Sequence, residues 1–474
     1  MTSHYRNPVV IGAGPTGLSA SWKLTELGID VRLLEKTEKI GGLAQTFRHG
    51  DYLFDIGPHI FHTFHAEILS LVKEILGNDL LRYYPKTKIF YKNRFVQYPL
   101  SGMKVFTVLP LMMVAPALIS FLLARWKLYL SHPREDGSFE SWIKSRFGKK
   151  LYDVYFAPYA QKVWMMKAAE ISKYIAEQKV PELKISDYVR RLFNRPPKKI
   201  HGEDASRMEV FYPRKGIGQL TNWLYDKVIE KGGKVDFNVD IHSINGKNSR
   251  IESITYRQDD ELVTRGTDFV FSTMPLNDLI EILKIKVPRD VREAAEHLGY
   301  VSAVLFYLKV NKRKLIDSSW VYFSSPDVWF NRVFDVGAFC EECVPAGKTA
   351  YCIEFTCNRG DKIWHAGADE LFDHVMQVFE RNSIMSRADV EGYTIKKVEH
   401  AYPRFKIGFD ERVRIILDFL STIENVFTIG RQGLFCYANV DDALYMGIRA
   451  VEMMNLRGDE KLETQRFLLK LDSE

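Results

Sequence analysis

A glycine-rich turn close to the N-terminus constrains the fold more than any other part of this sequence. The apolar run 8–11 leads directly into Gly12, Gly14 and Gly17, and a second apolar run ends at Glu35. In this pattern the first glycine permits a tight turn, the second lets the backbone approach a pyrophosphate, and the third lets a helix pack on the strand. The acid, about 20 residues further on, stands where a ribose needs a hydrogen-bond acceptor. The stretch therefore predicts a Rossmann-like β–α–β unit that binds a dinucleotide.

Two further glycine patterns extend this prediction. Gly41 and Gly42 follow shortly after the acid, and a backbone that folds back there suits a longer, extended cofactor. Near the other end, the apolar run 425–429 is expected to form a last strand that ends at Gly430 and precedes a helix over about 441–455. This order resembles the flavoproteins of the glutathione-reductase-like superfamily, in the amine oxidase and protoporphyrinogen oxidase branch.

The resemblance implies FAD as the cofactor, held by residues from both ends of the sequence. At the start of the first helix, free N–H groups and the positive end of the helix dipole are expected to stabilise the phosphates. The residues expected to contact FAD are Gly12, Gly14, Pro15, Thr16, Gly17, Glu35, Lys36, Gly41, Gly42, Leu43, Gly57, Pro58, His59, Val239, Gly430, Arg431, Asn439 and Asp441.

A second stretch narrows the family. Residues 57–63 read Gly-Pro-His-Ile-Phe-His-Thr and resemble the segment that UDP-galactopyranose mutases place beside the flavin ring. Shorter blocks resemble the same family in order, over 147–170, 212–219, 327–332, 401–403 and 430–441. The resemblance implies three catalytic residues, His59, His62 and Arg332. It also implies a set of substrate-binding residues, Tyr159, Trp164, Gln178, Tyr402 and Tyr437.

The sequence departs from the mutase pattern on the substrate side. The mutases carry an arginine on a mobile loop that clamps the substrate diphosphate, and this chain has Gln178 at that place. The neighbouring Lys179 offers a charge, but without the planar fork of a guanidinium. Cys436 stands where the family has an arginine, just before Tyr437. These changes weaken the case for UDP-galactose as the substrate and leave the flavin expectations intact.

Each of these residue types also has an ordinary structural interpretation. His59 and His62 follow a Gly-Pro turn that brings backbone near a ligand, which favours a flavin contact over two satisfied structural histidines. Trp164 and Tyr159 offer a stacking face and a hydroxyl to a sugar or a base, or else they are core aromatics. Arg332 offers a bidentate fork to a diphosphate, or else it is an ordinary surface charge.

The length of 474 residues predicts two or three domains. We expect an α/β fold in which a discontinuous Rossmann-like FAD-binding domain of the glutathione-reductase type is interrupted by helical and antiparallel-sheet substrate pieces. The FAD-binding segments are expected at 1–85, 209–275 and 400–474. The helical substrate or membrane-contact domain is expected at 101–200, and the antiparallel sheet at 86–100 and 276–399.

Residues 105–124 form an uncharged apolar run of transmembrane length. A single crossing would place segments of the FAD domain on opposite sides of the bilayer, which argues against a transmembrane helix. Two other interpretations remain. The run is a buried helix of the substrate domain, or it lies on a membrane surface. The basic run 190–199 and the formal net charge of +6 agree weakly with a phosphate-bearing surface, although a solvated face is the ordinary explanation. A nucleic-acid partner is not expected, because no recognition motif accompanies these charges.

The N-terminal residues 1–7 are short and polar, so we expect no signal peptide and a cytoplasmic protein, either free or peripheral at the inner face of the membrane.

Four cysteines lie close together in the sequence, and such a group can bind zinc. They are Cys340, Cys343, Cys352 and Cys357. Cys352 and Cys357 are expected on opposite faces of one strand, since side chains alternate along a strand. We therefore expect no metal, and reduced, buried cysteines instead.

Three functions follow from the resemblance. The first is a redox-neutral mutase, in which N5 of the reduced flavin attacks the anomeric carbon of a nucleotide-linked or lipid-linked sugar. The second is a net oxidoreductase of the amine oxidase, protoporphyrinogen oxidase or desaturase type, acting on an apolar or amphiphilic small molecule. The third is a flavin-binding protein without chemistry. All three rest on fold-level analogy, and the mutase is favoured.

Overall fold

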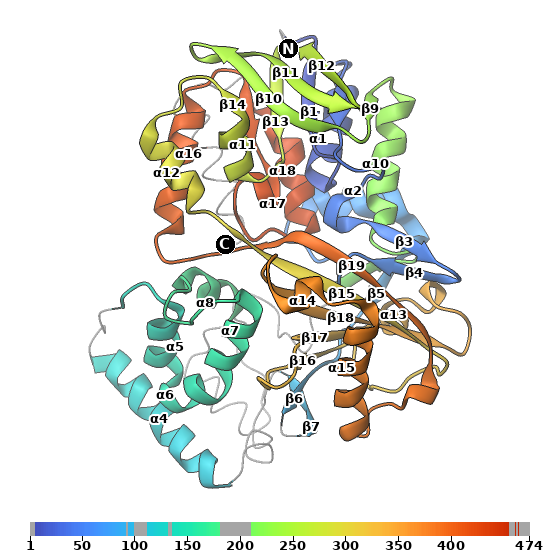
Figure 1. The fold of residues 1–474 in the computed structure, drawn as a ribbon, viewed down its shortest axis with the longest axis vertical. Coiled ribbons are helices and arrows are strands. Elements are labelled where there is room, and N and C mark those ends of the chain that lie inside the picture. Colours follow the sequence, from blue (N-terminus) through green and yellow to red (C-terminus); the bar gives the residue numbers. More distant parts are fainter. Residues whose placement is uncertain are drawn as a thin grey trace.

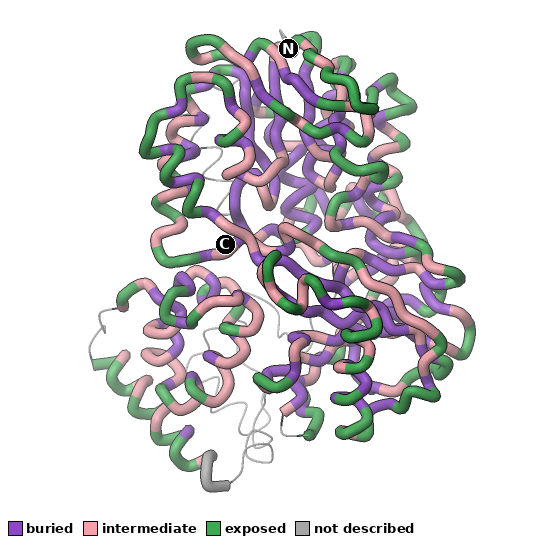
Figure 2. The backbone as a smooth tube through the Cα atoms, viewed as in Figure 1, coloured by how far each residue is buried: buried purple, intermediate pink, exposed green. Residues whose placement is uncertain are grey.

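The computed structural model describes residues 5–91, 93–98, 111–130, 135–180 and 210–454, together with residues 460 and 463. Figure 1 shows three parts: one built around a parallel sheet at the top, one built around a larger sheet below it, and a group of helices at the lower left. Figure 2 shows that buried residues concentrate along the two sheets.

A five-stranded parallel sheet forms the centre of the upper part (Figure 1). Its strands, in spatial order, are β20 (Val426–Thr428), β13 (Phe269–Ser272), β1 (Pro8–Ile11), β2 (Arg32–Leu34) and β9 (Lys234–Asp236). The strands β20, β13 and β1 are buried along their whole length, as expected for a parallel sheet covered on both faces. Four distant segments of the chain supply these strands, so the predicted discontinuous Rossmann-like α/β fold is confirmed.

Helices and a second sheet cover the parallel sheet. The helix α1 (Pro15–Glu26) packs against α10 (Gly218–Glu230) and α18 (Val440–Glu452). The side chains of a four-stranded sheet join the same hydrophobic core, and its order is β12 (Glu261–Gly266), β11 (Arg250–Gln258), β10 (Asp240–Lys247) and β14 (Leu283–Lys284).

A seven-stranded sheet forms the lower part. Its order is β19 (Val390–Pro403), β15 (Tyr300–Val310), β18 (Thr349–Cys357), β17 (Arg332–Asp335), β16 (Trp320–Phe323), β6 (Thr87–Tyr91) and β7 (Arg94–Tyr98). Neighbours are antiparallel except β16 and β6, and the predicted 88–98 hairpin is the pair β6–β7. The expected helix near 368–382 is α15 (Ala368–Arg381). Cys352 and Cys357 lie in different hydrophobic clusters, which confirms that they point to opposite faces of β18.

Shorter elements connect these sheets. They are β3 (Thr46–His49), β4 (Tyr52–Asp55), α2 (Ala66–Leu76), β5 (Leu80–Tyr83), β8 (Val210–Pro213), α13 (Val336–Phe339), α14 (Lys362–His365), α16 (Phe409–Ser421) and α17 (Gly430–Gly433). The strands β5 and β8 pair antiparallel, and they join the segment around residue 80 to the start of the segment 210–236.

The helical part contains α4 (Leu111–Leu130), α5 (Phe139–Phe147), α6 (Lys149–Leu151), a π-helical turn (Tyr152–Phe156), α7 (Ala157–Trp164) and α8 (Lys173–Lys179). Ser138 caps α5 and Ser172 caps α8, each accepting a backbone N–H in the first turn. Of the apolar run 105–124, residues 105–110 lie outside the described residues, as does the basic run 190–199. Among the described residues, no helix combines the length and hydropathy that a membrane crossing requires.

One expected segment boundary is wrong. The sequence predicts residues 276–298 as part of the antiparallel-sheet domain, but their helices α11 (Leu276–Ile282) and α12 (Arg289–Glu296) pack in the hydrophobic core of the upper part. The strand β14 pairs with β10, and α12 packs against α16. Leu276, Leu279 and Val291 bury their side chains in the core of the upper part. After the β6–β7 hairpin, the chain therefore returns to the seven-stranded sheet only at β15.

Candidate functional site

The three glycines of the N-terminal turn have three different environments. Gly12 has φ +95°, a left-handed conformation that favours glycine. A Cβ on Gly17 would lie 1.9 Å from the carbonyl oxygen of Gly12, so helix and strand meet without room for a side chain. A Cβ on Gly14 would meet nothing within 4 Å. The turn therefore presents bare backbone and open space at the N-terminus of α1.

The surroundings of this space fit an extended dinucleotide. Gly42 lies over it, since a Cβ on Gly42 would come 3.2 Å from the Cα atom of Gly14, and the Gly41 N–H donates to the carbonyl of Ala13 at 2.8 Å. The buried Glu35 carboxylate accepts from the Ala13 N–H at 2.7 Å and holds the acid beside the turn. A helix N-terminus that faces open space with no capping side chain is suited to phosphate.

The C-terminal segment reaches the same place. Gly430 has φ +79°, and a Cβ there would lie 2.7 Å from the Thr16 hydroxyl oxygen of α1. Asn439 caps α18 in a reciprocal capping box with Asp442. Burial, then the neighbouring Asp442, raises the pKa of Asp441 to about 7. The structure thus brings the predicted N-terminal and C-terminal cofactor residues together around α1.

A group of three acidic or imidazole side chains lies at the start of α18. The possible ligand atoms of His65, Asp441 and Asp442 all lie within 4.8 Å of one another, a spacing that a cation can use. The group already has partners, because His65 Nε2 lies 3.5 Å from an Asp442 carboxylate oxygen and the His65 ring stacks on Tyr445.

A buried cluster of charged and aromatic side chains lies between the seven-stranded sheet and the helical part. Its centre is an ion pair: Arg332 Nη2 of β17 lies 2.5 Å from Glu354 Oε2 of β18, directly across the two strands. The Tyr402 hydroxyl lies 3.3 Å from the same guanidinium nitrogen, and Asn331 donates to Glu354 at 2.7 Å. Burial, then Glu354, raises the pKa of Tyr402, so its hydroxyl stays protonated and can donate.

A second arginine and a lysine complete the positive charge of this cluster. The Arg431 guanidinium lies 5.2 Å from the centre of the Tyr402 ring and 4.7 Å from that of Tyr437. Its Nη atoms donate to the carbonyls of Ala438 and Ala401, each at 3.0 Å. Lys179 Nζ of α8 lies 3.4 Å from the centre of the Tyr437 ring, and Lys179, more than any other group, lowers the pKa of Tyr437.

Two arginine N–H groups of the cluster have unused hydrogen-bonding capacity. Within the part of the chain that the structure describes, Arg332 Nε and Arg431 Nε are buried and have no hydrogen-bond partner, as is also true of Arg404 Nε and Trp320 Nε1 outside the cluster. An anion bound between the two arginines would satisfy the first two donors.

Aromatic side chains form one wall of the cluster. The Tyr159 ring of α7 lies 5.7 Å from the Tyr322 ring of β16, and the Trp164 ring lies 5.9 Å from the Tyr402 ring. Burial raises the pKa of Tyr322 to about 12. Lys162, between the two aromatics of α7, donates to the carbonyls of Phe323 at 2.9 Å and Ser325 at 2.6 Å, so it ties α7 to the loop after β16.

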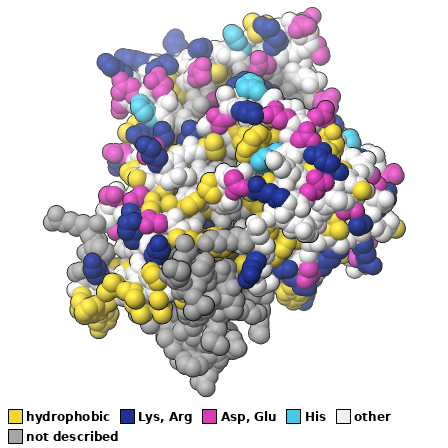
Figure 3. All heavy atoms as spheres, turned by 60° about the horizontal axis from the view of Figure 1, so that its bottom comes forward, with side chains coloured by type: hydrophobic (Ala, Val, Ile, Leu, Met, Phe, Trp, Pro, Cys, Tyr) yellow, Lys and Arg dark blue, Asp and Glu magenta, His cyan; other side chains and the backbone are white. Residues whose placement is uncertain are grey.

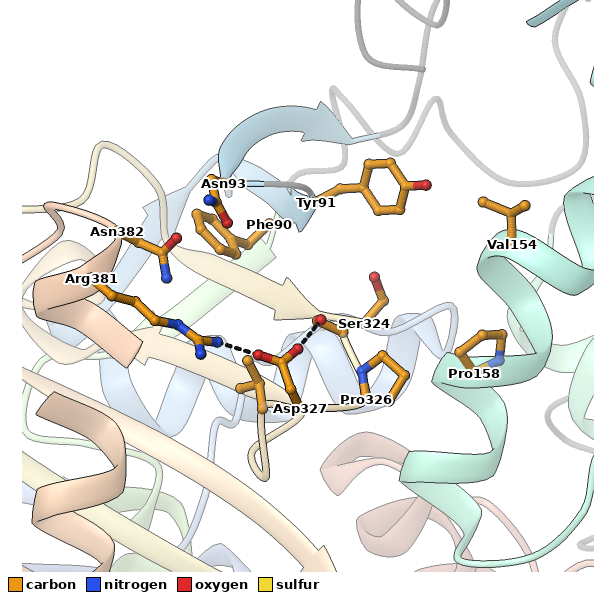
Figure 4. A pocket seen from close by; sticks show the side chains of 12 residues that line it. Phe90, Tyr91, Asn93, Val154, Pro158, Ser324, Pro326, Asp327, Arg381 and Asn382 are labelled. Atoms are coloured by element: carbon orange, nitrogen blue, oxygen red, sulfur yellow. Dashed lines mark hydrogen bonds and ion pairs between the residues drawn. The ribbon is translucent and has the colours of Figure 1, made fainter. Parts of the chain in front are cut away.

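A separate pocket of about 590 Å³, lined by none of these aromatic side chains, lies between the β6–β7 hairpin, the loop after β16 and the helical part (Figure 4). Phe90, Tyr91 and Asn93 of the β6–β7 hairpin line one side, and Val154 and Pro158 line another. Figure 4 shows the ion pair between Arg381 and Asp327 at its edge.

His59 lies beside the charged cluster. Its Nδ1–H donates to the Gly57 carbonyl at 3.1 Å. Burial, and also the charges of Arg431 and Arg332, lower the pKa of His59 to about 4, so the ring is neutral near pH 7. His62 makes an edge contact with the Phe64 ring, 4.8 Å between centres, and Phe64 is 77% exposed.

Neutral His59 makes stability depend on pH. Between pH 6.5 and about 4 the unfolded chain gains a proton on this residue that the folded protein does not. This group therefore lowers the free energy of unfolding as the pH falls through that window, by at most about 3 kcal/mol. Urea unfolding of the FAD-free protein at pH 7 and pH 4.5 is expected to show a smaller drop for His59→Gln than for wild type. His242→Gln, at an exposed position of β10, should follow the wild type. Equal drops for His59→Gln and wild type would contradict the assignment.

The structure assembles most of the predicted substrate residues. Tyr159, Trp164, Arg332, Tyr402 and Tyr437 meet in one cluster with Arg431, although the chain separates them widely. Gln178 is half-buried on α8, and the adjacent Lys179 is the residue whose charge reaches Tyr437. Among the other predicted residues, Val239 is buried and donates its N–H to the Glu35 carbonyl, and Lys36 is exposed.

Sequence reasoning missed two members of the cluster, Glu354 and Tyr322. Glu354 had a signal, because it is the one charged residue in 349–357, a run that otherwise has the composition of a buried strand. A carboxylate in such a run needs a partner. Tyr322 had no comparable signal.

The comparisons with known proteins agree with this geometry. The sequence profile of the flavin-containing amine oxidoreductases matches residues 15–404. The chain belongs to this family. It binds FAD, and the open space at Gly14 and the helix N-terminus fit that cofactor.

The individual relatives include both oxidases and a mutase. An L-amino-acid oxidase of Sistrurus catenatus edwardsii is 36% identical over 73 residues, 15% of this chain and 14% of the oxidase. A probable UDP-galactopyranose mutase of Klebsiella pneumoniae is 25% identical over 200 residues, 41% of this chain and 50% of the mutase. The chain spans only 8% to 15% of the length of the first curated relatives that it matches.

Solved structures show the same fold over the whole chain. A crystal structure of reduced UDP-galactopyranose mutase superposes with a TM-score of 0.83, at 20% identity, covering 98% of each chain. Putrescine oxidase bound to putrescine superposes with a TM-score of 0.63, at 16% identity, covering 94% of this chain and 98% of the oxidase.

Proposed function

We propose that this flavoenzyme is an intramolecular transferase of the UDP-galactopyranose mutase type that acts on a nucleotide-linked or lipid-linked sugar diphosphate. The observation that carries the proposal is the convergence of Arg332, Arg431 and Lys179 on Tyr402 and Tyr437: Arg332 lies at the Tyr402 hydroxyl, and the other two cations lie over the tyrosine rings. Among the described residues, the cluster holds three cations against one carboxylate, Glu354. A diphosphate would balance this excess of charge and would satisfy the two unpaired Nε groups.

The residues of the cluster have separate tasks in this proposal. When bound, reduced FAD supplies the nucleophile for the anomeric carbon. Arg332 and Arg431 bind the leaving diphosphate and stabilise its charge, and Lys179 adds a third cation from α8. Trp164 and Tyr159 offer a ring face and a hydroxyl to the sugar or the base. The low pKa of His59 keeps that ring neutral, so it adds no further positive charge.

A net oxidation is the second candidate. The chain belongs to the flavin-containing amine oxidoreductase family, and this membership favours an oxidation. An anionic amphiphile would suit the same cations, whereas an amine substrate would bring an ammonium group beside Arg332, Arg431 and Lys179. The electrostatics of the cluster therefore argue against a simple amine as the substrate of either reaction.

One assay separates the two candidates. The protein is reduced with dithionite and supplied with UDP-galactopyranose and related nucleotide sugars, and the products are separated by chromatography. We expect a ring-size isomer to form only with reduced flavin and without net consumption of electrons. Continuous oxygen consumption with an amphiphilic substrate, and no isomer from any nucleotide sugar, would contradict the mutase and support the oxidoreductase.

Two lysines of α8 provide a matched comparison in that assay. Lys179→Gln removes the cation beside Tyr437, so KM should rise about tenfold with little change in kcat. Lys173→Gln removes a cation of the same helix that pairs with Glu177 at 3.2 Å, and it should leave KM unchanged. An equal KM for both variants would remove Lys179 from the anion site.

A further inference from the structure

The outermost helix of the helical part, α4, exposes an apolar face. Its exposed side chains form a stripe that we call the α4 stripe: Leu118, Ile119, Leu122, Leu123, Trp126, Tyr129 and Leu130. Their exposure ranges from 43% to 86%, and they include half of the large exposed apolar side chains among the described residues. At about 100° per residue they fall within an arc of about 140° on one side of the helix.

The opposite face of α4 attaches the helix to the protein. Ala117 is buried, and a Cβ on Gly148 would lie 2.4 Å from the carbonyl oxygen of Ser120, so the two backbones are in close contact. The Ser120 hydroxyl also accepts the Lys150 N–H at 3.2 Å. The helix packs on α5 and α6 through this face. The side that faces the protein therefore includes Ala117 and Ser120 together with the half-buried Phe121 and Leu128, while the apolar side chains of the α4 stripe face outward.

The charges and aromatics of α4 suit a lipid surface. Arg125 and Lys127 lie on the two sides of the α4 stripe, and 111–130 contains no acidic residue. Trp126 and Tyr129, near the C-terminal end of α4, are 61% and 86% exposed, and these two residue types are enriched where a membrane meets water. Figure 3 shows hydrophobic side chains gathered at the lower left edge of the molecule, the side on which α4 lies in Figure 1. A contiguous exposed apolar patch with cations at its rim is the pattern of a peripheral membrane contact.

We propose that the α4 stripe docks the protein on an anionic phospholipid surface, with α4 lying in the plane of the interface. A lipid surface is favoured over a second copy of the chain because the stripe is only one helix wide, ends in Trp126 and Tyr129, and is bordered by Arg125 and Lys127 in a helix without acidic residues. The contact does not depend on which reaction the site catalyses.

The test is co-sedimentation of the full-length, FAD-loaded protein with vesicles of phosphatidylcholine, with and without phosphatidylglycerol. We expect clear binding to the phosphatidylglycerol vesicles, weakening as salt is raised. The double variant Leu122→Glu/Trp126→Glu should lower the partition coefficient at least about tenfold, since a charge in the apolar face resists insertion. Leu262→Glu is the matched control, because Leu262 is 62% exposed on β12, at the far end of the molecule (Figure 1).

FAD absorbance and the far-ultraviolet spectrum report whether each variant is folded. As a second readout, quenching of fluorescence by brominated lipid should be weaker in Trp126→Phe than in wild type. Equal partition of the double variant and wild type, or no binding of wild type to phosphatidylglycerol vesicles, would overturn the proposal. A different outcome is that the wild type binds no vesicles and self-associates in analytical ultracentrifugation, while the double variant remains monomeric. That result would assign the stripe to a contact with a second copy of the chain.

Discussion

Replacing Gly14 by valine is expected to abolish FAD binding and leave the chain folded. Gly14 has φ −75° and ψ 179°, which any residue adopts, and a Cβ there would meet no atom within 4 Å. The new side chain would instead occupy the open space at the N-terminus of α1, where the pyrophosphate approaches the backbone. We expect the dissociation constant of FAD to rise at least about 100-fold, because the phosphates lose both space and N–H donors. The flavin-to-protein ratio and thermal unfolding of the FAD-free forms measure the two effects separately.

Gly367 provides the matched control for this substitution. It is the N-cap residue of α15, with φ −78° and ψ 166°, and a Cβ there would also meet nothing within 4 Å. Gly367→Val therefore carries the same backbone and capping cost without touching the cofactor space. Gly17→Ala should behave differently from both, since its Cβ would clash with the Gly12 carbonyl and prevent folding. A Gly14→Val protein that retains FAD would show that the pyrophosphate lies elsewhere.

The parallel sheet was predictable because its signals are local. The turn at Gly12 and the acid Glu35 predict one β–α–β unit within a short stretch. The apolar run before Gly430 predicts the last strand of the same sheet. Residues 276–298 were misplaced for the opposite reason. Their helices contain enough apolar residues to pack on either part of the molecule, and only the pairing of β14 with β10 decides which core they join.

The site was predictable only as separate residues. Arg332 and Glu354 meet because the antiparallel register of β17 and β18 places them opposite each other, and the sequence carries no information on register at that distance. The resemblance to the mutases supplied Arg332, but it did not supply its partner. The sequence shows that Lys179 can supply a charge near the place of the missing arginine. The packing of α8 places its Nζ atom over the ring of Tyr437, which the sequence does not show.

The apolar run 105–124 shows a different limit. Hydropathy identifies apolar residues, but a buried helix and a surface-docked helix have the same hydropathy. The exposed fraction of each side chain along 114–130 distinguishes them, since seven large apolar side chains of α4 face outward and Ala117 faces inward. That distinction comes from packing on α5 and α6, which the sequence of α4 alone does not encode.

The second large effect is expected at the Arg332–Glu354 ion pair. Arg332→Met leaves the Glu354 carboxylate, which is 4% exposed, without its partner, so the free energy of unfolding should fall by about 3–5 kcal/mol. For the proposed reaction, turnover should fall about 1000-fold, because a guanidinium would no longer stabilise the anionic leaving group. The double variant Arg332→Met/Glu354→Leu removes both charges, so most of the lost stability should return, less the hydrogen bonds of Asn331 and Tyr402 to Glu354. Its turnover should stay low.

An exposed pair gives the reference for these measurements. Arg289 and Glu293 pair on α12 with 92% and 53% side-chain exposure, so Arg289→Met/Glu293→Leu and either single change should alter stability by less than about 1 kcal/mol. Urea unfolding and turnover of all five variants then separate structure from catalysis. Recovery of turnover together with stability in the Arg332→Met/Glu354→Leu protein would make Arg332 a structural residue and remove it from the anion site. If Arg332 binds the substrate, the Arg332→Met/Glu354→Leu protein should regain stability but not turnover. Apolar packing can replace a buried ion pair, but it cannot bind a diphosphate.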